Sequence, residues 1–251
     1  AKRTRNYELS RTSLVLSILP QPLQLALKQL RRCLMPSSCL LCGNNSSDSL
    51  LCPPCTSDLP PLPVQRCPQC GEQTTHGERC GACLKDSPAF EKASAIFRYE
   101  FPVDRIIHAY KYGHQLAVAE WAAELIAQQI NRDEYNLLIP MPLHAARLRE
   151  RGFNQSQEIA RRIASKKNLP LDSHSLIRNR PTAPQAELPM KERSRNVRGA
   201  FECTSDLSGR SVLLIDDVMT TGATLREAAR VIKLHGARRI DVAVVARAYK
   251  H

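Results

Sequence analysis

The chain has 251 residues, and its 43% hydrophobic and 24% charged content is ordinary for a soluble protein. No stretch approaches the roughly 18 consecutive apolar residues of a membrane span, which argues against a membrane-embedded protein. The net charge of +12 is uneven: residues 1–35 carry +6, residues 36–88 carry −2 and residues 89–251 carry +8, all of it within residues 147–198. Such a basic stretch suits pyrophosphate, nucleotides or nucleic acid, with a solvated face as the alternative for its helical part.

Residues 1–35 are expected to form a basic N-terminal extension. The apolar run Leu14–Leu19 faintly resembles a signal peptide, but Pro20 ends it early and no small-x-small cleavage site follows. We therefore expect a cytoplasmic protein. Leucines at helical spacing predict a short amphipathic helix in this extension: Leu23, Leu27, Leu30 and Leu34.

Residues 36–88 contain four Cys-x-x-Cys pairs, and two such pairs can complete one four-cysteine zinc site. A segment this poor in apolar residues needs a cross-link to stay folded. In the reducing cytoplasm that cross-link is a bound metal ion rather than a disulfide. We therefore predict a double zinc ribbon with two closed structural sites, in which the pairs combine either sequentially or in an interleaved order. The predicted ligands are Cys39, Cys42, Cys52, Cys55, Cys67, Cys70, Cys80 and Cys83.

Residues 89–251 show alternating strand and helix patterns. Apolar runs predict strands at 95–99, 137–143, 212–215 and 240–246. Helical periodicity predicts helices at 116–130, about 156–166 and 225–234. This alternation favours an α/β domain with a largely parallel sheet, preceded by the small zinc-ribbon domain.

The stretch Val212–Thr224 is the most informative in the chain. A buried strand ends in the acidic pair Asp216 and Asp217, and a loop of small and hydroxylic residues leads into a helix. Ligands of open α/β sheets bind at this edge, and such a loop can turn several backbone amides onto one phosphate. The carboxylates suit the hydroxyls of an attached sugar, or a metal over it. The predicted phosphate-binding residues are Thr220, Thr221, Gly222, Ala223 and Thr224.

Two details of this stretch carry further expectations. Thr224 and Glu227 fit a capping box, which places the start of the helix there. The plain alternative is an ordinary strand–turn–helix with two solvated aspartates. That alternative gives no reason for five consecutive small residues beside an acidic pair, so the sequence favours a sugar-phosphate site.

Two basic segments complete the predicted site. The segment 144–155 should be a loop at the same edge of the sheet, where Arg147 and Arg151 can meet pyrophosphate oxygens with paired donors. The polar segment 178–201, with Arg180 and Arg193, is too long for a plain connection. We interpret it as a lid over the site, with a disordered basic loop as the alternative.

The acidic pair followed by Thr-Thr-Gly-x-Thr resembles the phosphoribosyl diphosphate (PRPP) signature of type I phosphoribosyltransferases. The whole chain resembles the ComF/GntX family, which joins a double zinc ribbon to a phosphoribosyltransferase-like domain. The motifs that carry this resemblance are Lys111–Gly113, Pro140–Leu143, Arg147–Gln155, Thr182–Leu188, Arg193–Phe201 and Asp216–Thr224, together with the cysteines.

The resemblance covers roughly residues 37–248 and leaves out the basic extension, so we expect three parts: the extension 1–35, the double zinc ribbon 36–88, and a domain 89–251 with the fold of a type I phosphoribosyltransferase. It also implies that Asp216 and Asp217 hold the ribose hydroxyls of PRPP, that the 220–224 loop holds its 5′-phosphate, and that Mg²⁺ accompanies the pyrophosphate. The family is associated with natural competence and the handling of single-stranded DNA.

Two functions follow as hypotheses. The first is an enzyme that transfers the phosphoribosyl group to an unknown acceptor, for which Tyr110, Lys111 and Tyr112 are candidate contacts. The second is a non-catalytic module that senses PRPP or a related ribose phosphate and binds single-stranded DNA or a competence protein. The low aromatic content of 5% disfavours an extensive base-stacking platform.

Overall fold

The computed structural model describes residues 37–46, 48–180 and 196–249 of the chain. The chain divides into two compact units, Ala1–Ser57 and Asp58–His251, and each is described by itself. The helix expected around Leu23–Leu34 lies outside the described residues, as do residues 181–195 of the expected lid, including Arg193.

The described part of the unit Ala1–Ser57 contains a turn around Cys39 and Cys42, called the knuckle below, and the short helix α3 (Pro53–Ser57) that follows it. An isolated bridge between Ser38 and Asn45 closes the knuckle. So short a segment cannot bury a hydrophobic core of its own, which makes its cysteines the main source of order.

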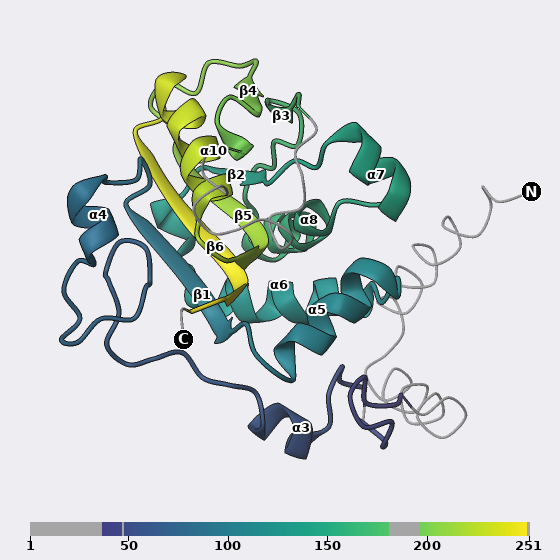
Figure 1. Cartoon of the computed structure of the whole chain (residues 1–251). Helices are drawn as coiled ribbons and strands as arrows, with labels where there is room; N and C mark the ends of the chain where they lie inside the picture. Colours follow the sequence, from purple (N-terminus) through teal and green to yellow (C-terminus); the bar gives the residue numbers. More distant parts are fainter. Residues whose placement is uncertain (1–36, 47, 181–195, 250–251) are drawn as a thin grey trace, which may run out of the picture. The chain divides into compact units, whose positions relative to one another are not determined.

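The unit Asp58–His251 is built on a four-stranded sheet in the order β1-β6-β5-β2 (Figure 1). All three strand pairings are parallel, which confirms the predicted fold class. The strands are β1 (Lys92–Arg98), β2 (Leu137–Pro140), β5 (Ser211–Met219) and β6 (Arg239–Arg247). The central strands β5 and β6 are almost continuously buried, as expected for a parallel sheet covered on both faces.

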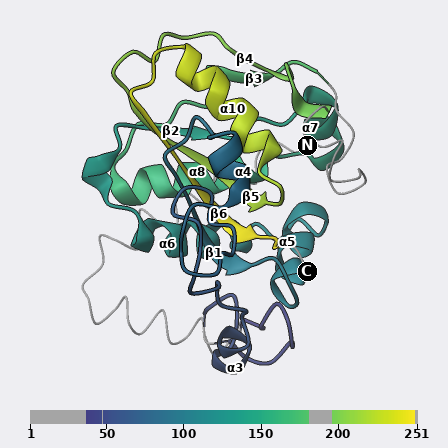
Figure 2. The same cartoon turned by 60° about the vertical axis from the view of Figure 1, so that its left-hand side comes forward.

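Helices cover both faces of this sheet (Figures 1 and 2). One face packs against α6 (Ala117–Gln129) and α8 (Gln155–Lys167), with α5 (Val103–Tyr112) beside α6. The other face packs against α10 (Ala223–Leu234). The remaining short helices are α4 (Gly81–Lys85), η1 (Arg132–Glu134) and α7 (Ala145–Arg151).

The second group of cysteines belongs to the core of this unit. Cys67, Cys70 and Cys83 are buried in one hydrophobic cluster with residues of α10 and of the strands. A strand-like contact links the same segment to the sheet, because the amide of Ala93 on β1 donates to the carbonyl of Gln69. The α10 face of the sheet is therefore completed by a metal-ligand segment rather than by a further helix.

Three segments differ in secondary structure from the sequence predictions. The strand predicted at 212–215 continues to Met219, so the acidic pair lies within β5 rather than after it. The expected loop 144–155 is largely the helix α7, which ends at Gly152 in the left-handed conformation. The antiparallel pair β3 (Leu176–Arg178) and β4 (Phe201–Cys203) was not predicted, and it brings the two ends of the expected lid together.

The predicted capping box is wrong. Helix α10 begins at Ala223, and its N-cap is Gly222 at a φ of +76°, which has no side chain that could cap the helix. Glu227 instead accepts hydrogen bonds from Arg230 on the same helix and from the backbone amide of Gly199. Glycine at this position takes a conformation that other residues resist, and this conformation turns the chain into the helix.

None of the helices in the described ranges is both long and apolar enough to cross a membrane.

Candidate functional site

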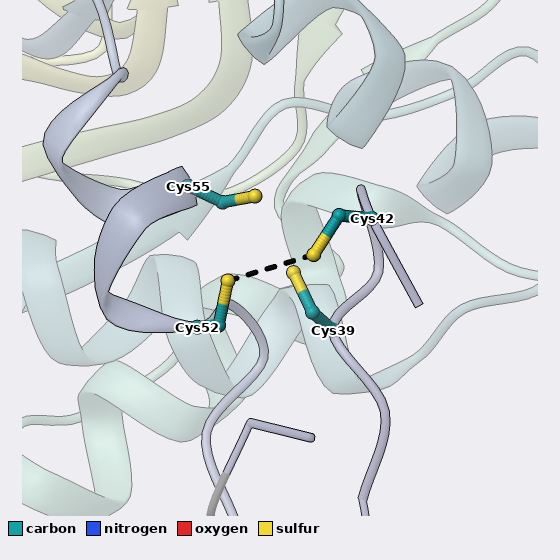
Figure 3. A group of neighbouring side chains, drawn as sticks. All are labelled: Cys39, Cys42, Cys52 and Cys55. Carbon is teal, nitrogen blue, oxygen red and sulfur yellow. Dashed lines mark hydrogen bonds between the residues drawn. The ribbon is translucent and has the colours of Figure 1, made fainter. Parts of the chain in front are cut away.

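The eight predicted zinc ligands form two tetrads by sequential pairing. Within each tetrad all four sulfur atoms lie within 4.8 Å of one another. Figure 3 shows the sulfurs of the first tetrad converging from the knuckle on one side and from the start of α3 on the other. The tetrads are Cys39, Cys42, Cys52 and Cys55, and Cys67, Cys70, Cys80 and Cys83.

The geometry of both tetrads fits a tetrahedral zinc ion. The sulfurs of Cys42 and Cys52 are 3.6 Å apart, and those of Cys70 and Cys80 are also 3.6 Å apart. Zn–S bonds of about 2.3 Å in a tetrahedron separate neighbouring sulfurs by roughly 3.8 Å. Since disulfide sulfurs lie only about 2.0 Å apart, the arrangement supports structural zinc and not disulfides, and it excludes the interleaved pairing.

Two arginines connect the segment of the second tetrad to helix α10 and strand β6 of the same unit. Arg226 on α10 donates one hydrogen bond to the sulfur of Cys83 at 3.5 Å and another to the carbonyl of Asp86 at 2.7 Å. Arg247 at the end of β6 is 3% exposed and pairs with Glu72 at 2.8 Å. A donor to a metal-bound thiolate orients the ligand, so the state of this tetrad and the placement of α10 depend on each other.

A cavity of about 560 Å³ opens at the carboxyl edge of the parallel sheet. Its walls come from the end of β5, the start of α10, the helix α7 and the C-terminal half of α5. Of the predicted phosphoribosyl-site residues, the cavity lining contains Asp216, Asp217, Thr220, Gly222, Ala223, Thr224, Arg147 and Arg151. Thr221 and Arg180 are not part of the lining.

The segment 220–224, which contributes four residues to the cavity lining, has backbone amides that are available as donors. The amides of Thr220, Thr221 and Gly222 donate to no backbone oxygen within the described residues. The hydroxyl of Thr221 accepts from the amide of Ala223 at 3.4 Å, which holds the turn in shape. Because α10 starts at once after Gly222, its N-terminus adds a favourable dipole for an anion.

The two carboxylates differ in their surroundings. Asp217 is 7% exposed, and its Oδ2 lies 2.8 Å from the Nζ of Lys111. Asp216 is partly buried, and its Oδ1 accepts from the hydroxyl of Ser156 at 2.8 Å and from the amide of Asp217 at 2.9 Å. The pair is thus fixed by contacts from α5 and α8, with Asp216 and Asp217 both on the cavity wall.

These surroundings shift the ionisation of the site. Burial raises the pKa of Asp216 to about 7, and the charge of Asp217 adds to the rise. Burial works against the charge of Lys111, but the carboxylate of Asp217 outweighs it, so the pKa of Lys111 is raised. A carboxyl group whose pKa is raised by burial and by a neighbouring charge is typical of functional sites.

The predicted basic residues have different positions. Arg151 donates to the side-chain oxygen of Gln155 at 3.2 Å and to the hydroxyl of Tyr112 at 3.3 Å, and its guanidinium lies over the Tyr112 ring. Arg147 lines the cavity from the same helix α7. Arg180 instead donates to the carbonyls of Asn196 and Arg198, where it ties the described ends of the lid segment together.

The candidate acceptor contacts separate in the structure. Tyr110 is fully buried, and its hydroxyl donates to the carbonyl of Gln155 at 2.8 Å, so it cannot face an acceptor. Lys111 and Tyr112 line the cavity. Sequence reasoning placed Arg178 in the expected lid, and the structure makes it a lining residue of the cavity. It missed Ser156 as a partner of Asp216. Helical spacing puts the neighbours Tyr110 and Lys111 on different faces of α5. This spacing was the signal in the sequence that could have separated the buried tyrosine from the cavity-lining lysine.

Comparison with known proteins agrees with this architecture. The Phosphoribosyl transferase domain family matches residues 114–251, and the Double zinc ribbon domain family matches residues 30–84. The DNA utilization protein YhgH of Salmonella typhimurium is 32% identical over 187 residues, which cover 71% of this chain and 82% of that protein.

Two further relatives are named competence proteins. Competence protein F of Haemophilus influenzae is 28% identical over 225 residues, covering 84% of this chain and 96% of that protein. Competence protein ComFC of Bacillus subtilis is 25% identical over 221 residues, covering 77% and 88% respectively. The chain therefore belongs to the ComF/GntX family, in which a double zinc ribbon is joined to a phosphoribosyltransferase domain.

Proposed function

We propose that this protein binds PRPP in the cavity at the edge of the sheet and transfers its 5-phosphoribosyl group to an acceptor. The bond between the ribose carbon and pyrophosphate breaks, a bond to the acceptor forms, and the acceptor loses a proton. One observation carries the proposal: two carboxylates, a loop of available amides and two arginines meet in a single cavity of about 560 Å³. That volume is within the usual range of roughly 300–1,000 Å³ for small-molecule sites.

Each chemical group of PRPP has a complementary set of residues in the cavity. The amides of residues 220–222 and the N-terminus of α10 suit the 5′-phosphate. Asp216 and Asp217 suit the ribose hydroxyls, and Arg147 and Arg151 suit the pyrophosphate. Carboxylate and phosphate oxygens side by side are also the ligands that Mg²⁺ prefers, and the ion would supply further charge to the departing pyrophosphate.

The same arrangement would favour the transition state. When pyrophosphate departs, positive charge develops on the ribose carbon, and the carboxylates of β5 beneath the ring stabilise it. The arginines of α7 stabilise the negative charge that develops on the leaving group. Because these groups are held by strands and helices, little reorganisation is needed during the reaction.

A ligand-binding experiment tests the site. PRPP with Mg²⁺ should raise the melting temperature of the full chain, and the double variant Asp216→Asn/Asp217→Asn should lose that increase. The single substitution Glu124→Gln, in an exposed ion pair with Lys166, serves as the control and should keep the increase. An equal increase in the double variant would show that the acidic pair does not hold the ligand.

A second candidate function is a non-catalytic PRPP or nucleotide sensor that binds single-stranded DNA or a competence protein. It is favoured by Arg149, which is exposed on α7 outside the cavity lining, and by the names of the relatives. Pyrophosphate release separates the two functions. A screen of bases, amines and oligonucleotides that yields PRPP-dependent pyrophosphate supports the enzyme, and binding without release supports the sensor.

A further inference from the structure

Lys111 holds an unusual position for a lysine. It lies in the last turn of α5, its side chain is 21% exposed, and its Nζ lies 2.8 Å from Oδ2 of Asp217, whose side chain is 10% exposed. It also lines the cavity. A largely buried ammonium is costly unless it is paired, so the ion pair is required for the lysine to be there at all.

A purely structural role does not account for this ion pair. Helix α5 is already held by the buried side chains of Val103, Ile106, Ile107 and Tyr110, and by the hydrogen bond from Tyr110 to the carbonyl of Gln155. A buried ion pair adds little stability over an apolar pair of the same size. A lysine whose charged end opens onto a ligand cavity is better suited to meeting a charged ligand.

The charges around the cavity make that role specific. The lining has four permanently cationic side chains, Lys111, Arg147, Arg151 and Arg178, and three acidic ones, Glu150, Asp216 and Asp217. Lys111 contacts the acidic pair directly, through the carboxylate of Asp217. Without it, the pair would repel the phosphate oxygens of any ligand whose ribose it holds. The flexible four-carbon stem of lysine allows its ammonium to exchange one oxygen partner for another nearby.

We propose that Lys111 is a ligand-binding residue of the cavity, whose ammonium moves from Asp217 to the phosphate oxygens of an entering diphosphorylated pentose. This move frees Asp217 for the ribose hydroxyls, and Lys111 supplies part of the positive charge that a divalent cation would otherwise provide. Binding should therefore persist when Mg²⁺ is withheld. The inference rests on the proposed function, since it concerns the same site.

Calorimetric titration of PRPP into the full chain tests this role, with and without Mg²⁺. The Mg²⁺-free buffer contains no added divalent cation and no chelator, because structural four-cysteine sites retain their zinc without an excess of the metal. The wild-type chain should bind in both buffers, with an affinity within about tenfold between them. Lys111→Met should bind at least about tenfold more weakly than wild type without Mg²⁺, and Mg²⁺ should restore part of the loss. Lys111→Arg, which keeps the charge, should stay within a few-fold of wild type.

Lys166→Met is the matched control, because Lys166 pairs with Glu120 and Glu124 outside the cavity, and it should behave as wild type. If the Lys111→Met chain melts at a lower temperature but keeps wild-type affinity in both buffers, the role of Lys111 is structural only and the proposal is wrong. Wild-type binding that requires Mg²⁺ absolutely would also overturn the role of Lys111 while leaving the PRPP site intact. Wild-type chain that binds PRPP in neither buffer would overturn the proposed function itself.

Discussion

The two cysteine tetrads have the same Cys-x-x-Cys chemistry but different surroundings. In the first tetrad Cys42 is exposed and Cys55 is half-buried, and the tetrad lies in the small unit Ala1–Ser57. In the second, only Cys80 is half-buried, and the other three cysteines share the hydrophobic cluster beneath α10. The same metal-binding element can thus hold a short segment together in one place and form part of a hydrophobic core in another.

The largest expected effect comes from breaking the second tetrad. Cys83→Ser should lower the melting temperature of the unit Asp58–His251 by at least about 10 °C and abolish the PRPP-dependent increase. Structural zinc sites contribute about 10 kcal/mol or more, which is comparable to the whole stability of a domain. Scanning calorimetry with zinc analysis measures both effects, and loss of one zinc without a change in melting temperature would contradict the comparison.

A smaller effect is expected from Glu72→Gln, which removes the charged partner of the buried Arg247. We expect a loss of about 1–3 kcal/mol in the free energy of unfolding, because a buried guanidinium would remain without its carboxylate. Urea denaturation measures it. Glu124→Gln, which breaks an exposed ion pair, should change the same quantity by less than about 0.5 kcal/mol, and equal losses in both variants would deny Glu72 a special role.

Arg226→Met tests whether zinc binding at the second tetrad and ligand binding in the cavity are connected through α10. Removing the donor to the Cys83 sulfur should weaken zinc retention at that tetrad by about tenfold or more, as is usual for groups that orient metal ligands. Because Arg226 lies on the first turns of α10, PRPP affinity should fall a few-fold as well. Competition with a chromogenic zinc chelator and PRPP titration give the two readouts.

The control for Arg226 is Arg230→Met, one turn further along α10 and half exposed, with Glu227 as its partner. It should leave zinc retention unchanged. If Arg230→Met releases zinc as readily as Arg226→Met, the effect would belong to helix stability and not to the hydrogen bond with Cys83.

The smallest effect is expected from Cys42→Ser in the first tetrad. One zinc per chain should be lost, while the main thermal transition should stay within about 1 °C of wild type, because that transition reports the unit Asp58–His251. PRPP binding should also be unchanged. A fall in the main transition comparable to that of Cys83→Ser would show that the two tetrads are equivalent after all.

Much of the fold was predictable because it depends on local patterns. Long apolar runs predicted the parallel strands, and the regular cysteine spacing predicted both tetrads, although only the structure distinguished sequential from interleaved pairing. The strand–loop–helix order around Asp216 also followed from local sequence. These features need no knowledge of distant contacts.

What escaped prediction depends on distant contacts or on weak local signals. The contact between Lys111 and Asp217 joins residues far apart in the chain, so no spacing rule reports it. The strands β3 and β4 have three residues each, too few for a visible alternation. The capping box failed because Gly222, two residues before the predicted cap Thr224, adopts a left-handed backbone conformation and caps the helix, which leaves Thr224 inside it.

The burial of Cys67, Cys70 and Cys83 beneath α10 has a practical consequence for recombinant fragments. A truncation that begins near residue 114, where the transferase family match begins, would remove these cysteines together with strand β1. The exposed apolar underside of α10 and an unprotected sheet edge would then favour precipitation. A fragment that starts at Asp58 keeps these parts together and is the better choice for crystallisation.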